Sequence, residues 1–348
     1  MTSHQSRTKR LVRCVLKACG LVAALVVGLI AATVAVNTRY FTDQSEAIMT
    51  PFHPFRSREA RDGYLTQYDL RARKWPVPSE TRMVSTAFGQ TFVRISGRES
   101  APPLVLLHGG SNNSLMWIPN IKTLSEHFRT YAIDAIDDNG RSIQTRPLKS
   151  PEDLINWLGE VLDALGLESG INLLGVSYGG WLASQCALRI PKRLSKIVMV
   201  APPLTVLPLS GGFAMRAILC LWPPRQYFTK RFLYWLFEDL ARSGAAGRAA
   251  LNDEAEFQSA AMQAFTPRRL VKPTLLTDSE LKGITVPALY LVGEHEKLYS
   301  SPAKEAVARL ARVAPQIRAE IMPGAGHDVT IVRADLVNKK ILEFLSQP

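Results

Sequence analysis

From about Arg82 onward, short apolar segments alternate with segments of helical periodicity, and this alternation limits the possible folds more than any other feature. The expected strands are residues 82–88, 90–96, 104–107, 130–134, 171–175, 196–200, 288–292 and 317–322. The expected helices are residues 114–128, 154–165, 179–188, 302–313 and 333–345. Strands that alternate with helices form a mostly parallel sheet covered by helices on both faces. Because the strands are apolar almost throughout, as buried parallel strands are, we predict one α/β domain over residues 81–348.

Residues 202–275 interrupt this alternation. They are rich in proline, helix formers and aromatic residues, the latter being Trp222, Tyr227, Phe228, Phe232, Tyr234, Trp235 and Phe237. We interpret the segment as a helical cap inserted after the strand at 196–200. The alternative is two ordinary surface helices that bury their aromatic side chains against the sheet.

The amino-terminal part has a different character. Residues 1–17 form a basic tail, and residues 18–36 carry no charge. At ~1.5 Å per residue, such a run is long enough as a helix to cross a ~30 Å hydrocarbon layer. The basic residues precede the run, so the sequence predicts a transmembrane helix with its amino end in the cytoplasm and the catalytic domain outside. A cleaved signal peptide, followed by secretion, is the alternative. Residues 37–80 are interpreted as a juxtamembrane lead-in containing a partly amphipathic helix.

Charge and cysteine content exclude several classes of protein. The chain of 348 residues has a net charge of +12, with 47% hydrophobic and 21% charged residues. That composition suits a globular core, and no basic stripe with interleaved aromatic residues indicates nucleic-acid binding. The four cysteines, Cys14, Cys19, Cys186 and Cys220, lack C-x-x-C spacing. We therefore expect no metal and no other cofactor.

Ser177 lies in the sequence Gly-Val-Ser-Tyr-Gly, between an expected strand and an expected helix. One interpretation is that Ser177 is simply a helix N-cap, whose hydroxyl accepts a hydrogen bond from a backbone N–H of the first turn. Gly175 and Gly179 on either side favour a nucleophile instead, because a sharp turn that exposes a serine requires close approach of neighbouring backbone. We predict that Ser177 is a nucleophile.

A nucleophilic serine needs a base, and the chain has six histidines. His327 follows the last expected strand, in a loop that can carry it over the carboxyl edge of the sheet. Its position after Ser177 in the chain also fits the order found in this fold class. The alternative is that His327 is a solvated loop residue.

A second histidine, His108, ends the strand at 104–107 in the sequence Leu-Leu-His-Gly-Gly. A turn of this kind can aim backbone N–H groups at a developing oxyanion. The predicted oxyanion donors are the N–H groups of Gly110 and Tyr178, with Ser111 nearby. His108 itself is expected to be structural.

Several motifs occur together in one order. They are Leu-His-Gly-Gly-Ser-Asn-Asn-Ser-Leu-Met-Trp-Ile-Pro-Asn at 107–120, Arg-Thr-Tyr-Ala-Ile-Asp at 129–134, Gly-Glu-His-Glu at 293–296, and Gly-His at 326–327. With these motifs the chain resembles an α/β-hydrolase, and within that superfamily the bacterial carboxylesterases of the naproxen-esterase type. The resemblance implies Ser177 as nucleophile, His327 as general base and acid, and a third acidic residue. Most members have Asp three residues beyond the strand-ending glycine, where this chain has Glu296; Glu294 and Asp328 are rivals for the role.

The resemblance implies a serine hydrolase that cleaves carboxylic esters through an acyl-enzyme. The aromatic cap predicts small-molecule esters with a hydrophobic acyl or alcohol group. One alternative is a non-hydrolytic receptor or signalling protein that keeps the same residues around a ligand pocket. Others are a C–C bond hydrolase, a thioesterase, or an aminopeptidase whose cap acids bind the substrate amine. The acids that could do so are Glu238, Asp239, Asp253, Glu254 and Glu256.

Overall fold

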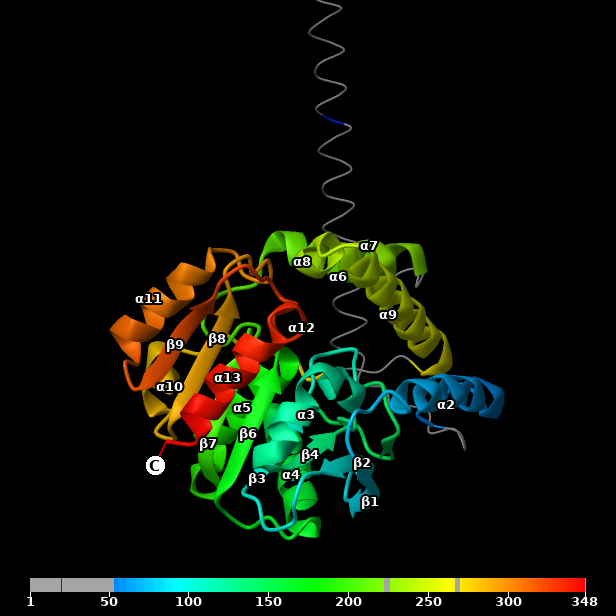
Figure 1. The fold of residues 1–348 in the computed structure, drawn as a ribbon, viewed down its shortest axis with the longest axis horizontal. Coiled ribbons are helices and arrows are strands. Elements are labelled where there is room, and N and C mark those ends of the chain that lie inside the picture. Colours follow the sequence, from blue (N-terminus) through cyan, green and yellow to red (C-terminus); the bar gives the residue numbers. More distant parts are fainter. Residues whose placement is uncertain (1–19, 21–52, 222–225, 267–269, 348) are drawn as a thin grey trace, which may run out of the picture. The chain divides into compact units, whose positions relative to one another are not determined.

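The structure is a computed structural model, and it describes Gly20 and residues 53–221, 226–266 and 270–347. The chain divides into two compact units, Met1–Ser45 and Glu46–Pro348. The fold described below, drawn in Figure 1, belongs to the second unit.

The described residues form a nine-stranded mixed sheet with the order β1-β2-β4-β3-β6-β7-β8-β9, and β5 pairs with β2. The strands are β1 (Glu80–Thr86), β2 (Gly89–Ser96), β3 (Pro103–Leu107), β4 (Arg129–Ile133), β5 (Ile143–Gln144), β6 (Ile171–Val176), β7 (Leu194–Val200), β8 (Ala288–Gly293) and β9 (Ile317–Met322). β2 is antiparallel to β1, β4 and β5. From β4 to β9 every neighbouring pair is parallel. The predicted α/β-hydrolase architecture is confirmed, with an antiparallel end to an otherwise parallel sheet.

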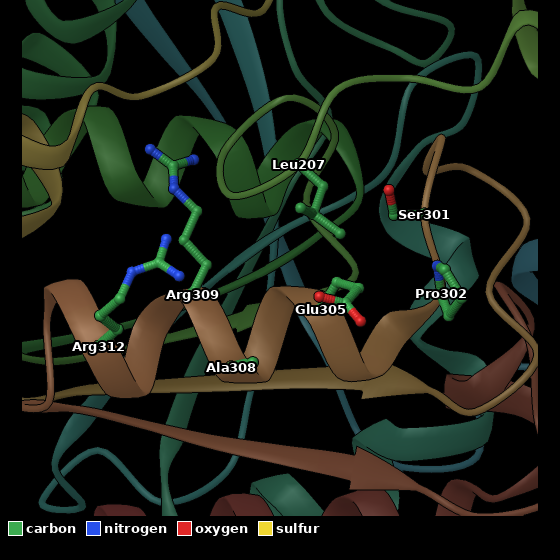
Figure 2. A pocket seen from close by; sticks show the side chains of 7 residues that line it. All are labelled: Leu207, Ser301, Pro302, Glu305, Ala308, Arg309 and Arg312. Carbon is green, nitrogen blue, oxygen red and sulfur yellow. The ribbon is translucent and has the colours of Figure 1, made fainter.

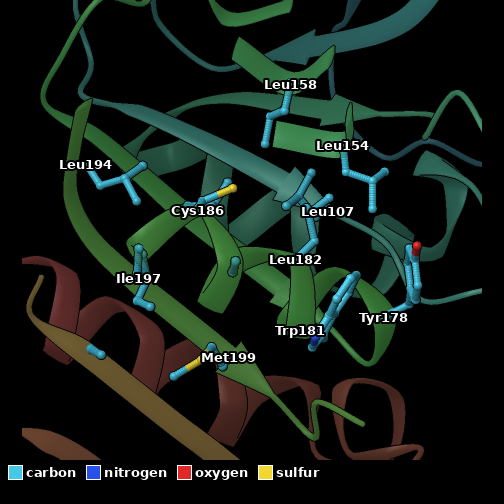
Figure 3. Packing of buried hydrophobic residues seen from close by; sticks show 14 of the residues in the cluster. Leu107, Leu154, Leu158, Tyr178, Trp181, Leu182, Cys186, Leu194, Ile197 and Met199 are labelled. Atoms are coloured by element: carbon cyan, nitrogen blue, oxygen red, sulfur yellow. The ribbon is translucent and has the colours of Figure 1, made fainter. Parts of the chain in front are cut away.

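Helices cover both faces of this sheet, and β3 shows why. Its side chains alternate, so Val105 and Leu107 join one apolar cluster while Leu104 and Leu106 join the other. The first cluster is completed by α4 (Pro151–Ala164), α5 (Tyr178–Arg189), α10 (Asp278–Gly283) and α11 (Ala303–Val313). The second is completed by α2 (Arg58–Ala72), α3 (Ile118–His127), α12 (Val329–Val332) and α13 (Ala334–Leu345). In the first cluster, Leu107 and Leu182 of α5 lie close together (Figure 3). The parallel strands all end at the same edge of the sheet, and the helices packed on both faces hold them there.

The interval predicted to form a cap is helical. It contains α6 (Gly211–Leu221), α7 (Gln226–Leu236), α8 (Glu238–Arg242) and α9 (Ala245–Ala264), all between β7 and β8. Leu233, Leu251 and Ala255 form a small apolar cluster of their own within it. The extent of the cap as a separate domain, about 202–275, stays a prediction.

Helix α2 lies in the part of the chain interpreted as a lead-in. It begins where the Ser57 side chain accepts a hydrogen bond from the Ala60 N–H, a typical N-cap. Tyr64 and Tyr68 on this helix are buried, and the helix packs against α9 (Figure 1).

The predicted transmembrane helix, and with it the predicted membrane anchoring and placement of the catalytic domain outside the cytoplasm, are corrected. Across the part of the chain that the structure describes, no helix has both the length and the apolar character needed to cross a membrane. The segment at 18–36 lies, apart from Gly20, outside the described residues. The prediction of a helix there rested only on the hydropathy of the uncharged run and on the charges that flank it.

Candidate active site

Ser177 lies on a sharp turn between β6 and α5. Its backbone has φ 51° and ψ −121°, and its side chain makes no capping hydrogen bond to the helix. A non-glycine residue in this region costs on the order of 1–3 kcal/mol and persists where surrounding structure enforces it. The hydroxyl of Ser177 is therefore not a helix cap and is available for chemistry.

The glycines that flank Ser177 allow this turn to pack tightly. A Cβ added to Gly175 would lie 2.0 Å from the carbonyl oxygen of Gly179, and one added to Gly179 would lie 2.2 Å from that of Leu107. Real Cβ atoms do not approach backbone so closely, so both positions require glycine. The turn is thereby pressed against the end of β3.

Three predicted residues meet at the carboxyl edge of the sheet. His327, in the loop after β9, has its Nε2 atom 3.1 Å from Ser177 Oγ. Its Nδ1 atom lies 2.9 Å from Glu296 Oε2, in the loop after β8. His327 and Glu296 are both buried. The structure thus joins a serine, an imidazole and a carboxylate in one hydrogen-bonded series.

The two rival carboxylates are engaged elsewhere. Glu294 Oε2 accepts a hydrogen bond from the Gly324 N–H at 3.0 Å, and Asp328 Oδ2 accepts one from the Leu240 N–H at 2.6 Å. The second oxygen of Glu296 accepts from the Leu298 N–H at 2.8 Å, which fixes that carboxylate in place. Of these three carboxylates, Glu296 is the one hydrogen-bonded to the imidazole of His327.

The electrostatic setting of His327 favours its charged form. Burial acts to lower the pKa of the imidazole, but the charge and hydrogen bond of Glu296, together with the charge of Asp328, raise it above its ordinary value. The ring of Phe237, between α7 and α8, lies almost parallel to the imidazole, with the planes 12° apart and the centroids 6.2 Å apart. An aromatic ring from the interval predicted to form the cap thus stacks on the imidazole.

Two backbone N–H groups beside Ser177 are candidates for an oxyanion site. A Cβ built on Gly110 would lie 3.7 Å from the Tyr178 Cβ, so the two residues are adjacent. The neighbouring N–H groups are occupied: that of Gly109 donates to Met116 Sδ at 3.1 Å, and that of Ser111 to Asp138 Oδ2 at 2.7 Å. No described residue accepts a hydrogen bond from the N–H of Gly110 or of Tyr178. Ser111 is thus excluded as a donor.

His108 has a structural setting. Its Nε2 accepts a hydrogen bond from the Ala135 N–H at 2.9 Å, so Nδ1 carries the proton and donates to the Gly109 carbonyl at 2.8 Å. Burial lowers the pKa of this imidazole. His108 links the loop after β3 to the loop after β4, as its position in the motif suggested.

Sequence reasoning missed some residues that shape this site. Met116 and Asp138, which occupy the N–H groups next to Gly110, were not singled out, although Met116 lies within the motif at 107–120. Phe237 was noted only as one of the cap aromatics. The contacts of Asp138 and Phe237 join segments that are distant in sequence, and Met116 bonds within its own loop through a sulfur atom that no local pattern marks.

A separate hollow of about 460 Å³ lies over α11 and shares no residue with the candidate site (Figure 2). Arg309 and Arg312 rise from the same side of α11 there. The Arg309 guanidinium donates to the carbonyls of Val206 and Leu276 and pairs with Asp278. It joins the first residues of the interval 202–275 to the segment that follows that interval.

Residues 104–339 match the alpha/beta hydrolase family. The carboxylesterase YbfK of Bacillus subtilis is 34% identical over 307 residues, which cover 84% of this chain and 96% of that protein. The uncharacterized carboxylesterase nap of the same organism is 34% identical over 290 residues, 81% of this chain and 92% of that protein. The crystal structure of naproxen esterase from Bacillus subtilis matches with a TM-score of 0.74 and 34% identity, covering 83% of this chain and 99% of that one. The chain belongs to the alpha/beta hydrolase family, as its motifs predicted.

Proposed function

We propose that this protein is a carboxylesterase that hydrolyses small-molecule esters through an acyl-enzyme on Ser177. The hydrogen-bonded series from Ser177 through His327 to Glu296 is the observation that carries the proposal. Similarity to carboxylesterases over more than four fifths of the chain bears out the predicted class of reaction.

In this mechanism the Nδ1–H of His327 donates to Glu296, so Nε2 is free to accept the hydroxyl proton. Ser177 Oγ attacks the ester carbonyl carbon as that proton moves to the imidazole. The negative charge that develops on the carbonyl oxygen is stabilised by the N–H groups of Gly110 and Tyr178. His327 then gives the proton to the departing alcohol, and water releases the acid from the acyl-enzyme by the same sequence.

Glu296 has two parts in this scheme. It holds the imidazole in the tautomer that leaves Nε2 able to accept, and it stabilises the imidazolium that forms during attack. Glu is one methylene longer than the Asp found at this position in most members of the superfamily. The bond from Leu298 N–H to its other oxygen keeps the longer side chain oriented.

Four of the five cap acids on which the aminopeptidase alternative depends are engaged elsewhere. Glu238 pairs with Lys297 and Arg242. Asp239 lies 3.2 Å from His295, while Asp253 and Glu254 both pair with Arg71. These carboxylates connect the cap to the rest of the domain and are not poised to bind a substrate amine. Nothing in the comparisons favours a non-hydrolytic receptor, so we retain ester hydrolysis with a hydrophobic substrate.

Replacement of the nucleophile tests the proposal. Ser177→Ala should lower turnover of p-nitrophenyl esters by about 10⁴–10⁶-fold while leaving the fold unchanged. A fluorophosphonate probe should label Ser177 in the parent protein, located by peptide mass mapping. A panel of p-nitrophenyl esters of increasing chain length then defines the preferred acyl group. Full activity of the alanine variant, or labelling of a different serine, would contradict the proposed mechanism.

A further inference from the structure

A tyrosine on α2 reaches the catalytic edge of the sheet. Tyr68 is fully buried, and its helix precedes residues 104–339, which the family model matches. The hydroxyl of Tyr68 donates to Asp134 Oδ2 at 3.0 Å and lies 3.1 Å from Ser114 Oγ. Both partners belong to loops at the carboxyl ends of strands, Ser114 after β3 and Asp134 after β4.

Asp134 is the point where these loops are joined. Its carboxylate is fully buried and accepts hydrogen bonds from the N–H of Ser114 at 2.7 Å and from the N–H of Arg141 at 2.8 Å. The hydroxyl of Tyr68 is its third donor. A buried carboxylate is stable only when its oxygens are well satisfied. Tyr68 therefore helps to fix both Asp134 and the Ser114 end of the loop after β3.

That loop carries one of the two proposed oxyanion donors. The N–H of Gly110 lies between attachments on both sides: Ser111 is held by Asp138, and His108 is held by the Ala135 N–H. Farther along the same loop, the N–H of Ser114 is held by Asp134. The direction of the Gly110 N–H thus depends on contacts with the loop after β4 and, through Asp134 and Ser114, on Tyr68.

The same helix is tied to the cap. Arg71 on α2 pairs with Glu254 on α9 at 2.8 Å, and its guanidinium lies 4.1 Å from the ring centroid of Phe257. The ring of Tyr64 stacks on Phe257 with centroids 5.2 Å apart. Helix α2, which lies beside the end of α9 (Figure 1), is therefore held by contacts with α9 and by the bonds of Tyr68 to Asp134 and Ser114.

We propose that Tyr68 is a positioning residue for ester hydrolysis, which fixes the Gly110 N–H for the developing oxyanion through Ser114 and Asp134. This inference rests on the proposed function, and it makes α2 part of the catalytic structure. Tyr68 touches neither Ser177 nor the substrate in this scheme. Its effect should appear in stabilisation of the transition state and not in ground-state binding.

Tyr68→Phe removes only the hydroxyl and keeps the buried ring. Loss of an oxyanion donor lowers kcat by about 10²–10³-fold. Because Tyr68→Phe displaces the Gly110 N–H without removing it, the variant should lower kcat by roughly 10-fold and leave KM unchanged. The affinity for an aryl trifluoromethyl ketone, which forms an oxyanion on Ser177, should fall by the same factor. Both are measured at equal folded content.

Thr130→Val is the matched control. Thr130 is also fully buried, and its hydroxyl donates to the Ser96 carbonyl at 3.1 Å, but it lies near the start of β4, at the opposite end from the site. This variant should lose comparable stability with no change in kcat or ketone affinity. If Tyr68→Phe behaves like Thr130→Val while Ser177→Ala is inactive, the inference on Tyr68 fails and the proposed function stands.

A second variant approaches the same contact from the other side. Ser114→Ala removes the hydroxyl that faces Tyr68 and should also lower kcat with KM unchanged. The Tyr68→Phe and Ser114→Ala double variant should lose less than the product of the two single effects, because both act on one loop. Independent, fully multiplicative losses would contradict a shared route to Gly110.

Discussion

The loops after β3 and β9 each place a buried histidine at the carboxyl edge of the sheet, but the two rings have different partners. His108 is bonded only to backbone, namely the Gly109 carbonyl and the Ala135 N–H. His327 lies between a hydroxyl and a carboxylate, those of Ser177 and Glu296. Burial lowers the pKa of His108, whereas Glu296 more than offsets burial and raises that of His327.

Burial alone therefore does not make a histidine catalytic. A buried imidazole without a carboxylate stays neutral, and with both nitrogens engaged by backbone it has no site for a transferred proton. A carboxylate behind the ring stabilises the imidazolium that forms when a proton is taken from Ser177. We therefore assign chemistry to the loop after β9 and support of the oxyanion donors to the loop after β3.

Replacing the two histidines tests this comparison, and the variant of His327 has the largest expected effect. His327→Ala removes the base and should lower kcat by about 10⁶-fold, as loss of the nucleophile does in triad enzymes. His108→Gln loosens the loop of Gly110 and should cost roughly 10–100-fold, below the loss expected when an oxyanion donor is removed outright. Steady-state kinetics with p-nitrophenyl esters, on samples of equal far-ultraviolet circular dichroism, make the comparison. Equal losses in the two variants would remove the distinction between the loops.

The two glutamates of the loop after β8 test which carboxylate acts together with Ser177 and His327. Glu296→Gln should lower kcat by about 10⁴-fold, because an amide no longer favours the required imidazole tautomer. Glu294→Gln should cost less than about 10-fold, since its amide oxygen can still accept from the Gly324 N–H. The measurement is kcat for both variants at equal folded content. An inactive Glu294→Gln beside a nearly unaffected Glu296→Gln would reverse the assignment.

The sequence alone predicted the parts of this molecule that depend on local pattern. Ser177 and its glycines lie within five residues between a strand and a helix, and His327 follows the last strand directly. Glu296 needed the family resemblance, because Glu294 lies in the same loop and only a tertiary contact separates them. The short elements β5 and α12 carry too few residues to show a period.

Contacts between distant segments could not be predicted from the sequence. Tyr68 and Asp134 are 66 residues apart, and nothing in a helix of mixed polarity marks one tyrosine as the partner of a buried carboxylate. The stacking of Phe237 on His327 depends on how the cap returns to the sheet. The prediction of a membrane helix was wrong for a different reason: it rested on hydropathy and flanking charge alone, and no helix among the described residues is long and apolar enough to cross a membrane.

The smallest expected effect concerns pH, and it tests the cause of the difference between the two histidines. Hydrolysis requires neutral His327, so kcat/KM should rise with pH through a midpoint that reports the pKa of this imidazole in the free enzyme. Because Glu296 raises that pKa, the midpoint should lie above the ordinary histidine value of 6.5. In Glu296→Gln the carboxylate is gone and burial, which lowers the pKa, remains. The midpoint of the residual activity should therefore move to lower pH.

The pH profile is measured with an uncharged ester, so that only the enzyme titrates. Glu294→Gln is the control, because Glu294 does not bond to the imidazole, and its midpoint should match that of the parent protein. His108→Gln should also leave the midpoint in place, since neutral His108 does not titrate in this range when burial lowers its pKa. An unmoved midpoint in Glu296→Gln would mean that the carboxylate orients the imidazole without stabilising its charge. A midpoint that moves only in His108→Gln would assign the base to the loop after β3 instead.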